Sequence, residues 1–222
     1  MFYEPCKNDH GLPRNPFKSC TVPRAIGWIS TKNEDGSDNL SPYSQFTNLT
    51  FDPPLVLFSA NQNVWGDRKA TIKNTERTGE FVYNMVPYAL REEMNRSSII
   101  EAPDGMDKFA YAGVGKAPSK LVDVARVAES PIQYECRYVQ TIRLPGNGTL
   151  GTIDCIVGEV VGIHIADEFI TGEGKIDICR IQPLARLGYF DYTVVERSFE
   201  LPPPSVSPDR QTLVDQGLEG SV

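Results

Sequence analysis

The chain has 222 residues, of which 40% are hydrophobic, 23% charged and 9% aromatic, and this balance is ordinary for a globular protein with a core. Its formal net charge of −7 argues against a nucleic-acid-binding surface. No apolar run approaches the ~20 residues that a membrane-spanning helix needs. We therefore expect a folded protein that contacts neither nucleic acid nor membrane.

The five cysteines are scattered through the chain without a CxxC pair, and there are only two histidines. This pattern predicts neither a metal site nor a disulfide scaffold. The first residues, MFYEPCKNDHG, lack the basic start and apolar core of a secretory signal peptide. We therefore expect reduced thiols and a cytoplasmic location, with Cys136 and Cys155 filling core positions.

The first sixty residues predict three strands. Residues 24–31 form a compact apolar stretch, and residues 39–50 are expected to return beside it after a turn that ends in Asp-Gly. Pro42 confines this second strand to a sheet edge or a bulge. Residues 54–60 are a short continuous apolar run, which is typical of a buried strand.

Helical patterns gather in the middle of the chain. A helix is predicted over residues 68–78, with Asp67 as its N-cap and Gly79 as its C-cap. A strand over residues 80–86 follows, and two short helical segments are predicted within residues 88–97 and 105–112.

Strands return in the last third of the chain. They are predicted over residues 132–139, where apolar and polar side chains alternate, and over residues 153–165 and 175–181. Strands in hairpin succession with few helices predict a mainly β (α+β) fold built on a closed antiparallel barrel. Residues 201–222 are rich in proline and polar side chains, so a mobile or partner-wrapping tail is predicted there.

Two glycine-containing segments resemble nucleotide-binding loops, but their neighbours argue against that function. The segment GVGK at residues 113–116 has alanine where a phosphate loop needs Gly and Ser or Thr, so we interpret it as a solvated loop. No helix follows GEG at residues 172–174. His164 is expected to be a hydrogen-bonded residue near a strand end, and no side chain is predicted to be catalytic.

Residues 67–71 (DRKAT) are the segment best suited to binding an anion. They place two cations and a hydroxyl on the first turn of the predicted helix, where free N–H groups and a partial positive charge favour a phosphate. A solvated charged turn is the alternative interpretation.

Five segments, in this order along the chain, resemble the flavin reductase-like, FMN-binding split-barrel family, and the resemblance covers roughly residues 10–200. They are PRAIGWIST at residues 23–31, NLSPYS at 39–44, DPPLVLFS at 52–59, KATIKNTERTGEF at 69–81 and RLG at 186–188. Each segment alone is a weak signal, whereas the ordered set is specific.

The resemblance implies an FMN-binding split β-barrel domain over residues 1–200 and a homodimer that holds FMN non-covalently at its interface. The flavin phosphate would lie against Lys69 and Thr71, with Arg68 nearby. The other residues implied as cofactor-binding are Ser30, Thr31, Asn39, Ser41, Tyr43, Ser44, Ser59 and Asn61. Trp28, Tyr189 and Phe190 are candidate neighbours of the flavin ring, although the last two could equally fill a core or an interface.

The function implied is that of an oxidoreductase that moves electrons from NADH or NADPH through FMN to a flavin, a partner oxygenase or another protein. The cofactor would carry the redox chemistry, so the protein needs no acid or base of its own. Reductases of two-component monooxygenases often carry Gly-Asp-His where this chain reads GTI at residues 151–153. An FMN-holding electron-transfer or flavin-binding protein without an efficient nicotinamide site is therefore the alternative. An oxidase for a pyridoxine-type phosphate is a more distant option.

Overall fold

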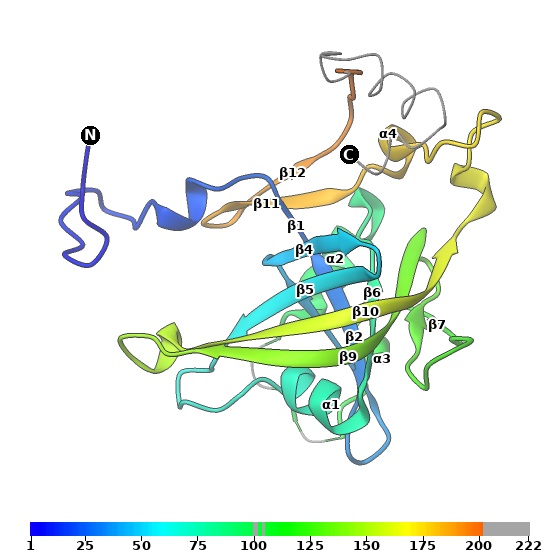
Figure 1. Ribbon diagram of the computed structural model, residues 1–222, viewed down its shortest axis with the longest axis horizontal. Helices are drawn as coiled ribbons and strands as arrows, with labels where there is room; N and C mark the ends of the chain where they lie inside the picture. The colour runs from blue at the N-terminus through cyan, green and yellow to red at the C-terminus, as the bar shows by residue number, and fades with distance from the viewer. Residues whose placement is uncertain (100–101, 104, 202–222) are drawn as a thin grey trace.

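The structure is a computed structural model that describes residues 1–99, 102–103 and 105–201. Within this part of the chain, a seven-stranded antiparallel sheet in the order β3-β2-β6-β9-β10-β5-β4 forms the body of the molecule (Figure 1). Its strands are β2 (Gly27–Lys32), β3 (Asp38–Tyr43), β4 (Phe46–Phe51), β5 (Pro54–Asn61), β6 (Glu80–Asn84), β9 (Ile132–Leu144) and β10 (Ile153–Ile165). The mainly β fold that the sequence predicts is confirmed.

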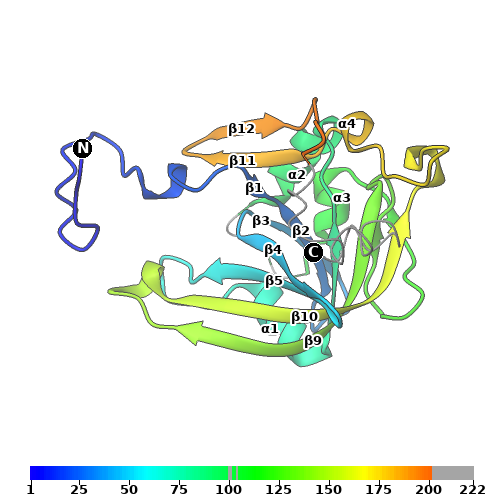
Figure 2. The same ribbon diagram turned by 45° about the horizontal axis from the view of Figure 1, so that its top comes forward.

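Smaller elements decorate this sheet. A second sheet, in the order β1-β11-β12, lies beyond one end of the body, at the top of Figures 1 and 2. It consists of β1 (Arg24–Ala25), β11 (Leu184–Gly188) and β12 (Asp191–Val194), and a separate pair is made by β7 (Lys116–Ala117) and β8 (Arg126–Val127). The helices are α1 (Ala70–Thr78), α2 (Arg91–Ser97), α3 (Lys108–Ala112) and α4 (Ile178–Ile181), and short 3-10 turns occupy Phe17–Ser19, Tyr88–Leu90, Thr149–Gly151 and Asp167–Phe169.

The large sheet curls on itself, so that the edge strand β4 approaches β2 and β6 near the opposite edge. The ring of Phe46 on β4 stacks on Tyr83 of β6, with 4.3 Å between ring centroids. A Cβ at Gly27 would lie only 2.7 Å from the Phe46 ring, so glycine permits this close approach. The interior is filled by fully buried apolar side chains such as Ile29, Phe58 and Phe81.

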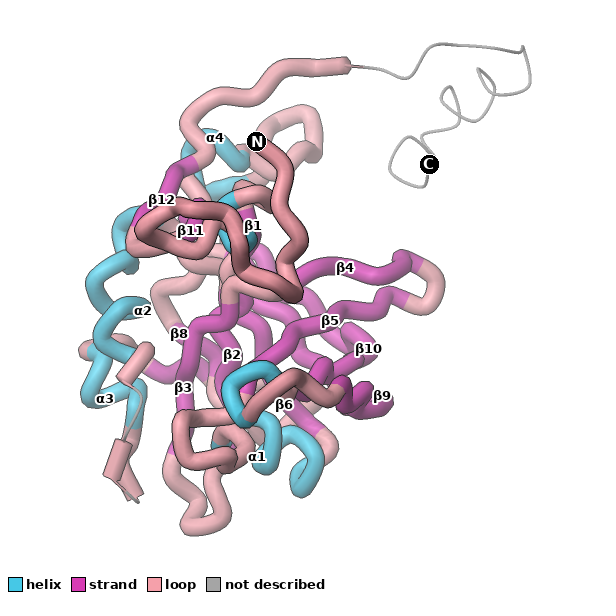
Figure 3. The backbone as a smooth tube through the Cα atoms, turned by 90° about the vertical axis from the view of Figure 1, so that its left-hand side faces the viewer, coloured by secondary structure: helices cyan, strands magenta, loops and turns pink. Residues whose placement is uncertain are grey.

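A second apolar core lies on the outer face of β2 and β3. There Trp28 and Leu40 pack with Met94 of α2 and Phe109 of α3, all of them buried. Figure 3 shows both helices beside β3 and away from the barrel interior. Burying side chains of this size stabilises a fold by roughly 1.5–3 kcal/mol each, so this core fixes the start of α3 next to β3.

The edge position that Pro42 predicts for its strand is confirmed, because β3 is the first strand of the sheet. The single strand predicted over residues 39–50 is instead two strands, β3 and β4. The C-cap predicted for α1 is also confirmed, since Gly79 has a φ of 75°. The helix begins later than predicted, however, with Lys69 as its N-cap. Asp67 belongs to a preceding turn, in which its N–H donates to the side-chain oxygen of Asn63 at 2.7 Å.

The strand predicted over residues 175–181 is wrong. The apolar residues of this segment form α4, and the carboxylate of Asp177 accepts the N–H of Arg180 at 3.1 Å as a helix cap. A segment of four residues is too short for its pattern to separate a helix from a strand. The chain then returns as β11 and β12, which the sequence analysis missed.

The predicted tail, residues 201–222, lies outside the described residues except for Leu201. Within the described part of the chain, no helix is long and apolar enough to cross a membrane. The same residues contain no group of three or more His, Cys, Asp or Glu side chains that could hold a metal ion. All five cysteines are free thiols; Cys136 is buried and Cys155 half-buried.

Candidate functional site

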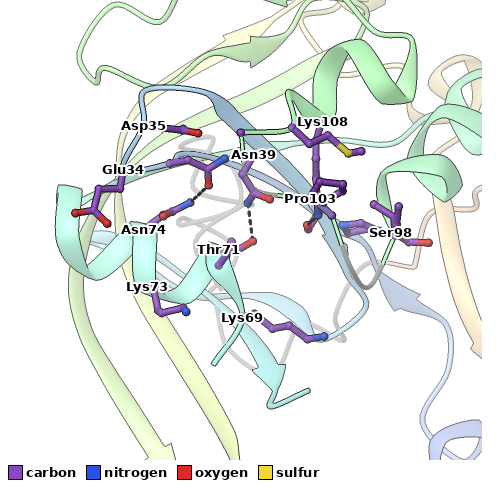
Figure 4. Close-up of a pocket in the computed structure, with 18 of the residues that line it drawn as sticks. Glu34, Asp35, Asn39, Lys69, Thr71, Lys73, Asn74, Ser98, Pro103 and Lys108 are labelled. Atoms are coloured by element: carbon purple, nitrogen blue, oxygen red, sulfur yellow. Dashed lines mark hydrogen bonds between the residues drawn. The ribbon is translucent and has the colours of Figure 1, made fainter. Parts of the chain in front are cut away.

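A pocket of about 770 Å³ opens between β3, α1 and the segment that leads into α3 (Figure 4). This volume falls in the range of roughly 300–1,000 Å³ that is usual for small-molecule sites. Five of the residues predicted to bind a cofactor line it, namely Asn39, Ser41, Tyr43, Lys69 and Thr71. The structure therefore brings together residues that lie up to 32 positions apart in the sequence.

One face of α1 forms a cationic wall of this pocket. Lys69, Lys73 and Arg77 all line the pocket and follow one another at intervals of four residues, which places them on the same helix face. Arg77 donates to the backbone oxygen of Lys32 at 2.5 Å, which fixes its position. The sequence analysis missed Lys73 and Arg77, although the spacing from Lys69 is a signal that could have indicated them.

A buried amide network supports the pocket from behind. The side-chain amide of Asn39 donates to the hydroxyls of Thr71 at 2.9 Å and Thr31 at 3.0 Å. The amide of Asn74 donates to Thr31 at 3.2 Å and to the side-chain oxygen of Asn33 at 2.7 Å. Thr31, which the sequence predicts as a cofactor-binding residue, thus positions Asn39 and Asn74 instead of lining the pocket itself.

Tyr43 presents a neutral hydroxyl at the end of β3. Its ring packs on Phe58 with 5.3 Å between centroids. Burial raises the pKa of Tyr43 to about 12, and hydrogen bonds with Thr71 and Ser41 oppose the shift only in part. At neutral pH the phenol therefore keeps its proton and can donate a hydrogen bond.

Lys108, the first residue of α3, is a pocket residue that the sequence analysis missed. It is 8% exposed, and its ammonium donates to the Ser41 hydroxyl at 2.9 Å. Burial, with a smaller contribution from the charge of Lys69, lowers the pKa of Lys108 to about 8. No motif in the sequence indicated a role for this residue.

An ionic bridge holds α3 against β3. The ammonium of Lys116 lies 2.6 Å from a carboxylate oxygen of Asp38 and 2.5 Å from one of Asp107. Asp107 also caps α3 by accepting the N–H of Phe109 at 3.0 Å. The segment at 113–116, predicted as a solvated loop, therefore supplies a structural cation through Lys116.

The pocket is not lined by the predicted serines Ser30, Ser44 and Ser59 or by Asn61. Ser30 is buried and donates to the backbone oxygen of Ala125 at 2.7 Å. Ser59 is buried on β5, where it pairs with Cys155 of β10. Asn61 donates to the backbone oxygen of Leu150 at 2.9 Å, and Ser44 lies half-buried between β3 and β4.

Arg68, expected near a phosphate, lies instead in an ion-pair network outside the pocket. Its guanidinium contacts both carboxylate oxygens of Glu76, at 2.7 and 2.6 Å, and one oxygen of Asp154 at 3.0 Å. The Asp154 side chain is 1% exposed. Arg68 therefore ties the start of α1 to β10 and neutralises a buried carboxylate.

The three aromatic residues proposed as ring neighbours lie away from the pocket of the described chain. Trp28 is fully buried, and its indole donates to the Ser97 hydroxyl at 2.8 Å. Tyr189 and Phe190 occupy the turn between β11 and β12, far from α1 in both Figure 1 and Figure 2. Phe190 is 86% exposed.

His164 is hydrogen-bonded within the strand region, as the sequence predicts. Its Nε2 lies 2.5 Å from a carboxylate oxygen of Glu135. That carboxylate also accepts the N–H groups of Lys120 at 2.8 Å and Leu121 at 2.6 Å. The pair therefore holds the segment before β8 against the sheet.

Sequence comparisons find one matching family model and relatives that align with most of the chain. Residues 19–191 match the model of the flavin reductase like domain. The chain is 34% identical over 190 residues to an uncharacterized protein of Halalkalibacterium halodurans, a match that covers 86% of this chain and 90% of the relative. It is 33% identical over 187 residues to an uncharacterized protein of Deinococcus radiodurans, covering 81% of this chain and 79% of the relative.

Solved structures with the same architecture include proteins with named activities. Nitrilotriacetate monooxygenase component B from Bacillus cereus is 25% identical with a TM-score of 0.82, and the match covers 90% of this chain and 98% of that one. 2-Nitrobenzoate 2-nitroreductase of Pseudomonas fluorescens is 27% identical with a TM-score of 0.73, over 86% and 90% of the two chains. Flavoredoxin of Desulfovibrio vulgaris, at 19% identity and a TM-score of 0.66 over 85% and 94%, shares the fold.

Proposed function

Because the chain belongs to the flavin reductase-like, FMN-binding split-barrel family, we propose that it is an FMN-dependent oxidoreductase that takes electrons from NADH or NADPH. The observation that carries this proposal is the polar pocket, in which Lys69, Thr71 and Asn39 meet at the N-terminus of α1. The electrons would pass to a free flavin or to a protein acceptor.

The residues at the start of α1 fit the phosphate of FMN. The ammonium groups of Lys69 and Lys73 form no ion pair with any described acidic side chain. The helix N-terminus adds unpaired N–H groups and a partial positive charge beside them. A phosphate monoester carries close to two negative charges at neutral pH, so this corner of the pocket offers the complementary charge.

Other pocket residues suit the polar parts of a flavin. Ser41 and Tyr43 place hydroxyl groups along β3, and Asn39 is held in one orientation by its two threonine partners. Fixed polar groups of this kind, the two hydroxyls and the amide oxygen of Asn39, orient a ligand without reorganising when it binds. Bound FMN would supply hydride and single-electron transfer, while these residues bind and orient it.

A partner oxygenase is one acceptor that the comparisons support. The similar protein from Bacillus cereus is a component of a monooxygenase, and the one from Pseudomonas fluorescens is a nitroreductase. We propose that this chain likewise delivers electrons to a separate acceptor.

The direct test of the proposed function is anaerobic stopped-flow spectroscopy of the FMN-loaded protein mixed with NADH or NADPH. We expect the oxidised flavin absorbance to disappear within seconds with at least one donor. Absence of FMN binding would contradict the whole proposal.

One observation favours the alternative of an electron-transfer protein without a nicotinamide site. Gly151, Thr152 and Ile153 occupy the place where related reductases carry Gly-Asp-His, at the end of the connection between β9 and β10, and Ile153 begins β10. On this alternative, FMN binds and is reduced by dithionite, but neither NADH nor NADPH reduces it. The stopped-flow experiment therefore separates the two functions.

We further propose that residues 1–200 form a single domain that acts as a homodimer. The family model spans residues 19–191, which supports one domain. Exposed aromatic side chains at Phe17 and Phe190 would be covered by a second copy. Sedimentation of the FMN-bound protein at micromolar concentration should give twice the 24.7 kDa mass of one chain, and a species of one-chain mass would contradict the dimer.

A further inference from the structure

We propose that Lys69 and Lys108 form a two-lysine clamp that binds the phosphate ester of the ligand from two walls of the pocket. The proposal rests on the proposed function for the identity of the ligand, FMN. It assigns a ligand-binding role to Lys108, which lies outside the segments that indicated the family.

The position of Lys108 is the first support. The side chain is 8% exposed and lines the pocket from α3, whereas Lys69 lines it from the N-cap of α1 (Figure 4). An ammonium group has three N–H donors, and the Ser41 hydroxyl, at 2.9 Å, is its one hydrogen-bond acceptor among the described residues. A buried cation without a counter-ion is unfavourable, so an anion in the pocket would stabilise this arrangement.

Three carboxylates on the elements around Lys108 have other partners. Asp107, the N-cap of α3, and Asp38, on β3, both bind the ammonium of Lys116. The carboxylate of Asp35 accepts the N–H and the hydroxyl of Ser37. Lys108 is therefore left without an acidic partner within the described part of the chain.

Cations and carboxylates are equal in number on the elements around Lys108, so Lys108 itself leaves one excess positive charge. The charged or titratable groups on the surrounding elements are Glu34 and Asp35 of the turn before β3, Asp38 and Tyr43 of β3, Lys69, Lys73 and Arg77 of α1, Asp107 of α3, Lys116 of β7, and Glu93 and Arg96 of α2. Glu93 and Arg96 pair with each other at 2.8 Å. The positive charge of Lys69 contributes to the lowered pKa of Lys108, so the two cations repel each other until an anion binds.

The clamp has a pH signature. Because the pKa of Lys108 is lowered to about 8 in the free protein, this side chain loses its proton just above neutral pH. A phosphate monoester has its second pKa near ~6 and stays doubly charged over this range. FMN affinity should therefore fall by about tenfold between pH 7 and pH 9, as the protonated fraction of Lys108 falls.

Titrations of the full-length protein with FMN and with riboflavin test the clamp. Lys108→Met keeps roughly the length of the side chain and removes its charge, whereas Lys108→Arg keeps a positive charge that does not titrate in this pH range. The matched control is Lys120→Met, because Lys120 is exposed and lies outside the pocket. We expect Lys108→Met to lower the affinity for FMN about tenfold or more at pH 7 and the affinity for riboflavin by less than about twofold. The reason is that only FMN has a phosphate that can form a charge-assisted hydrogen bond with Lys108. Lys108→Arg should bind FMN with no fall between pH 7 and pH 9.

Unchanged FMN affinity in Lys108→Met, or equal losses for FMN and riboflavin, would overturn the clamp. Inorganic phosphate provides a readout that does not depend on the flavin, because phosphate should raise the Tm of the wild-type protein and of Lys120→Met but not that of Lys108→Met. If the wild-type protein fails to bind FMN, the proposed function is wrong, and the phosphate response alone decides whether the clamp exists. If Lys108→Met does not fold, the pH dependence of Lys108→Arg against wild type decides it.

Discussion

The side-chain amide of Asn39 donates a hydrogen bond to the hydroxyl of Thr71, with 2.9 Å between nitrogen and oxygen, and both residues are at most 2% exposed. Asn39 lies on the edge strand β3, and Thr71 lies in the first turn of α1. This contact fixes the distance between the two elements that line the cationic side of the pocket. A change at either residue should therefore affect both stability and ligand binding.

Asn39→Ala should lower the free energy of unfolding by about 1–3 kcal/mol, because it removes the amide donor to the buried hydroxyl of Thr71 and one of the two amide donors to that of Thr31. The measurement is urea denaturation followed by tryptophan fluorescence. Asn48→Ala, at an exposed position of β4, is the matched control and should stay within about 0.5 kcal/mol of wild type. Equal stability of Asn39→Ala and Asn48→Ala would show that the buried network contributes nothing.

Lys69→Ala should lower the affinity for FMN by at least about tenfold and the affinity for riboflavin hardly at all, because a charge-assisted hydrogen bond to the phosphate contributes roughly 1.5–3 kcal/mol. Quenching of flavin fluorescence measures both affinities. Lys120→Ala serves as the control for a general loss of positive charge. An equal loss of affinity for both flavins would place the phosphate elsewhere.

Most strands of the large sheet and the helix α1 could be predicted from the sequence because local patterns specify them. The continuous apolar run of β5 and the glycine after α1 are signals carried by neighbouring residues. Lys108 could not be found in this way, because its place in the pocket depends on the packing of α3 against β3, some seventy positions away. The structure shows this contact, whereas spacing along the chain does not.

Arg68 illustrates the opposite case. Its position beside Lys69 suggested a phosphate contact, yet Glu76 and Asp154 bind its guanidinium. Glu76 lies eight residues further along the chain, but Asp154 lies on the distant strand β10. A local pattern can predict that a cation is present, and only the fold decides which carboxylate neutralises it.

Arg68→Met should therefore lower the free energy of unfolding by more than it weakens the free energy of FMN binding. Removing the guanidinium leaves Asp154 buried without its closest cation, and breaking a buried ion pair costs about 3 kcal/mol. The bond from Arg68, supported by the Thr141 hydroxyl, holds the pKa of Glu76 below its usual range. The stabilisation from the Arg68–Glu76 contact is fully present above the ordinary carboxyl pKa of 4.5. It is lost as the pH falls through the lowered pKa of Glu76 in the folded protein.

Urea denaturation of wild type and Arg68→Met at several pH values measures this effect. The difference in unfolding free energy should be largest near neutral pH and should shrink below about pH 4.5. Arg137→Met, on the exposed surface of β9, is the matched control. A difference that stays constant down to pH 3 would mean that the Glu76 contact is not responsible.

The turn between β11 and β12 supports a last prediction, about self-association. Phe190 is 86% exposed there, and an exposed phenylalanine gains roughly 1.5–3 kcal/mol when a partner buries it. If the proposed homodimer uses this turn, Phe190→Ala should raise the dimer Kd by about tenfold or more while leaving the urea midpoint of the fold unchanged. Phe199→Ala, also 86% exposed but beyond the strands, is the control. Sedimentation velocity over a range of concentrations measures the dimer Kd of both variants.

The same variant tests whether this turn reaches the flavin. Within one chain, Tyr189 and Phe190 lie far from the pocket, so they could contact a bound flavin only across a dimer interface. Aromatic contacts with a ring contribute about 0.5–1.5 kcal/mol beyond burial, and their loss should change the rate of flavin reduction in stopped-flow experiments. A Phe190→Ala protein that is still dimeric but reduced at an altered rate would place the turn at the flavin. Wild-type reduction and wild-type sedimentation together would show that Phe190 serves neither the flavin nor the dimer.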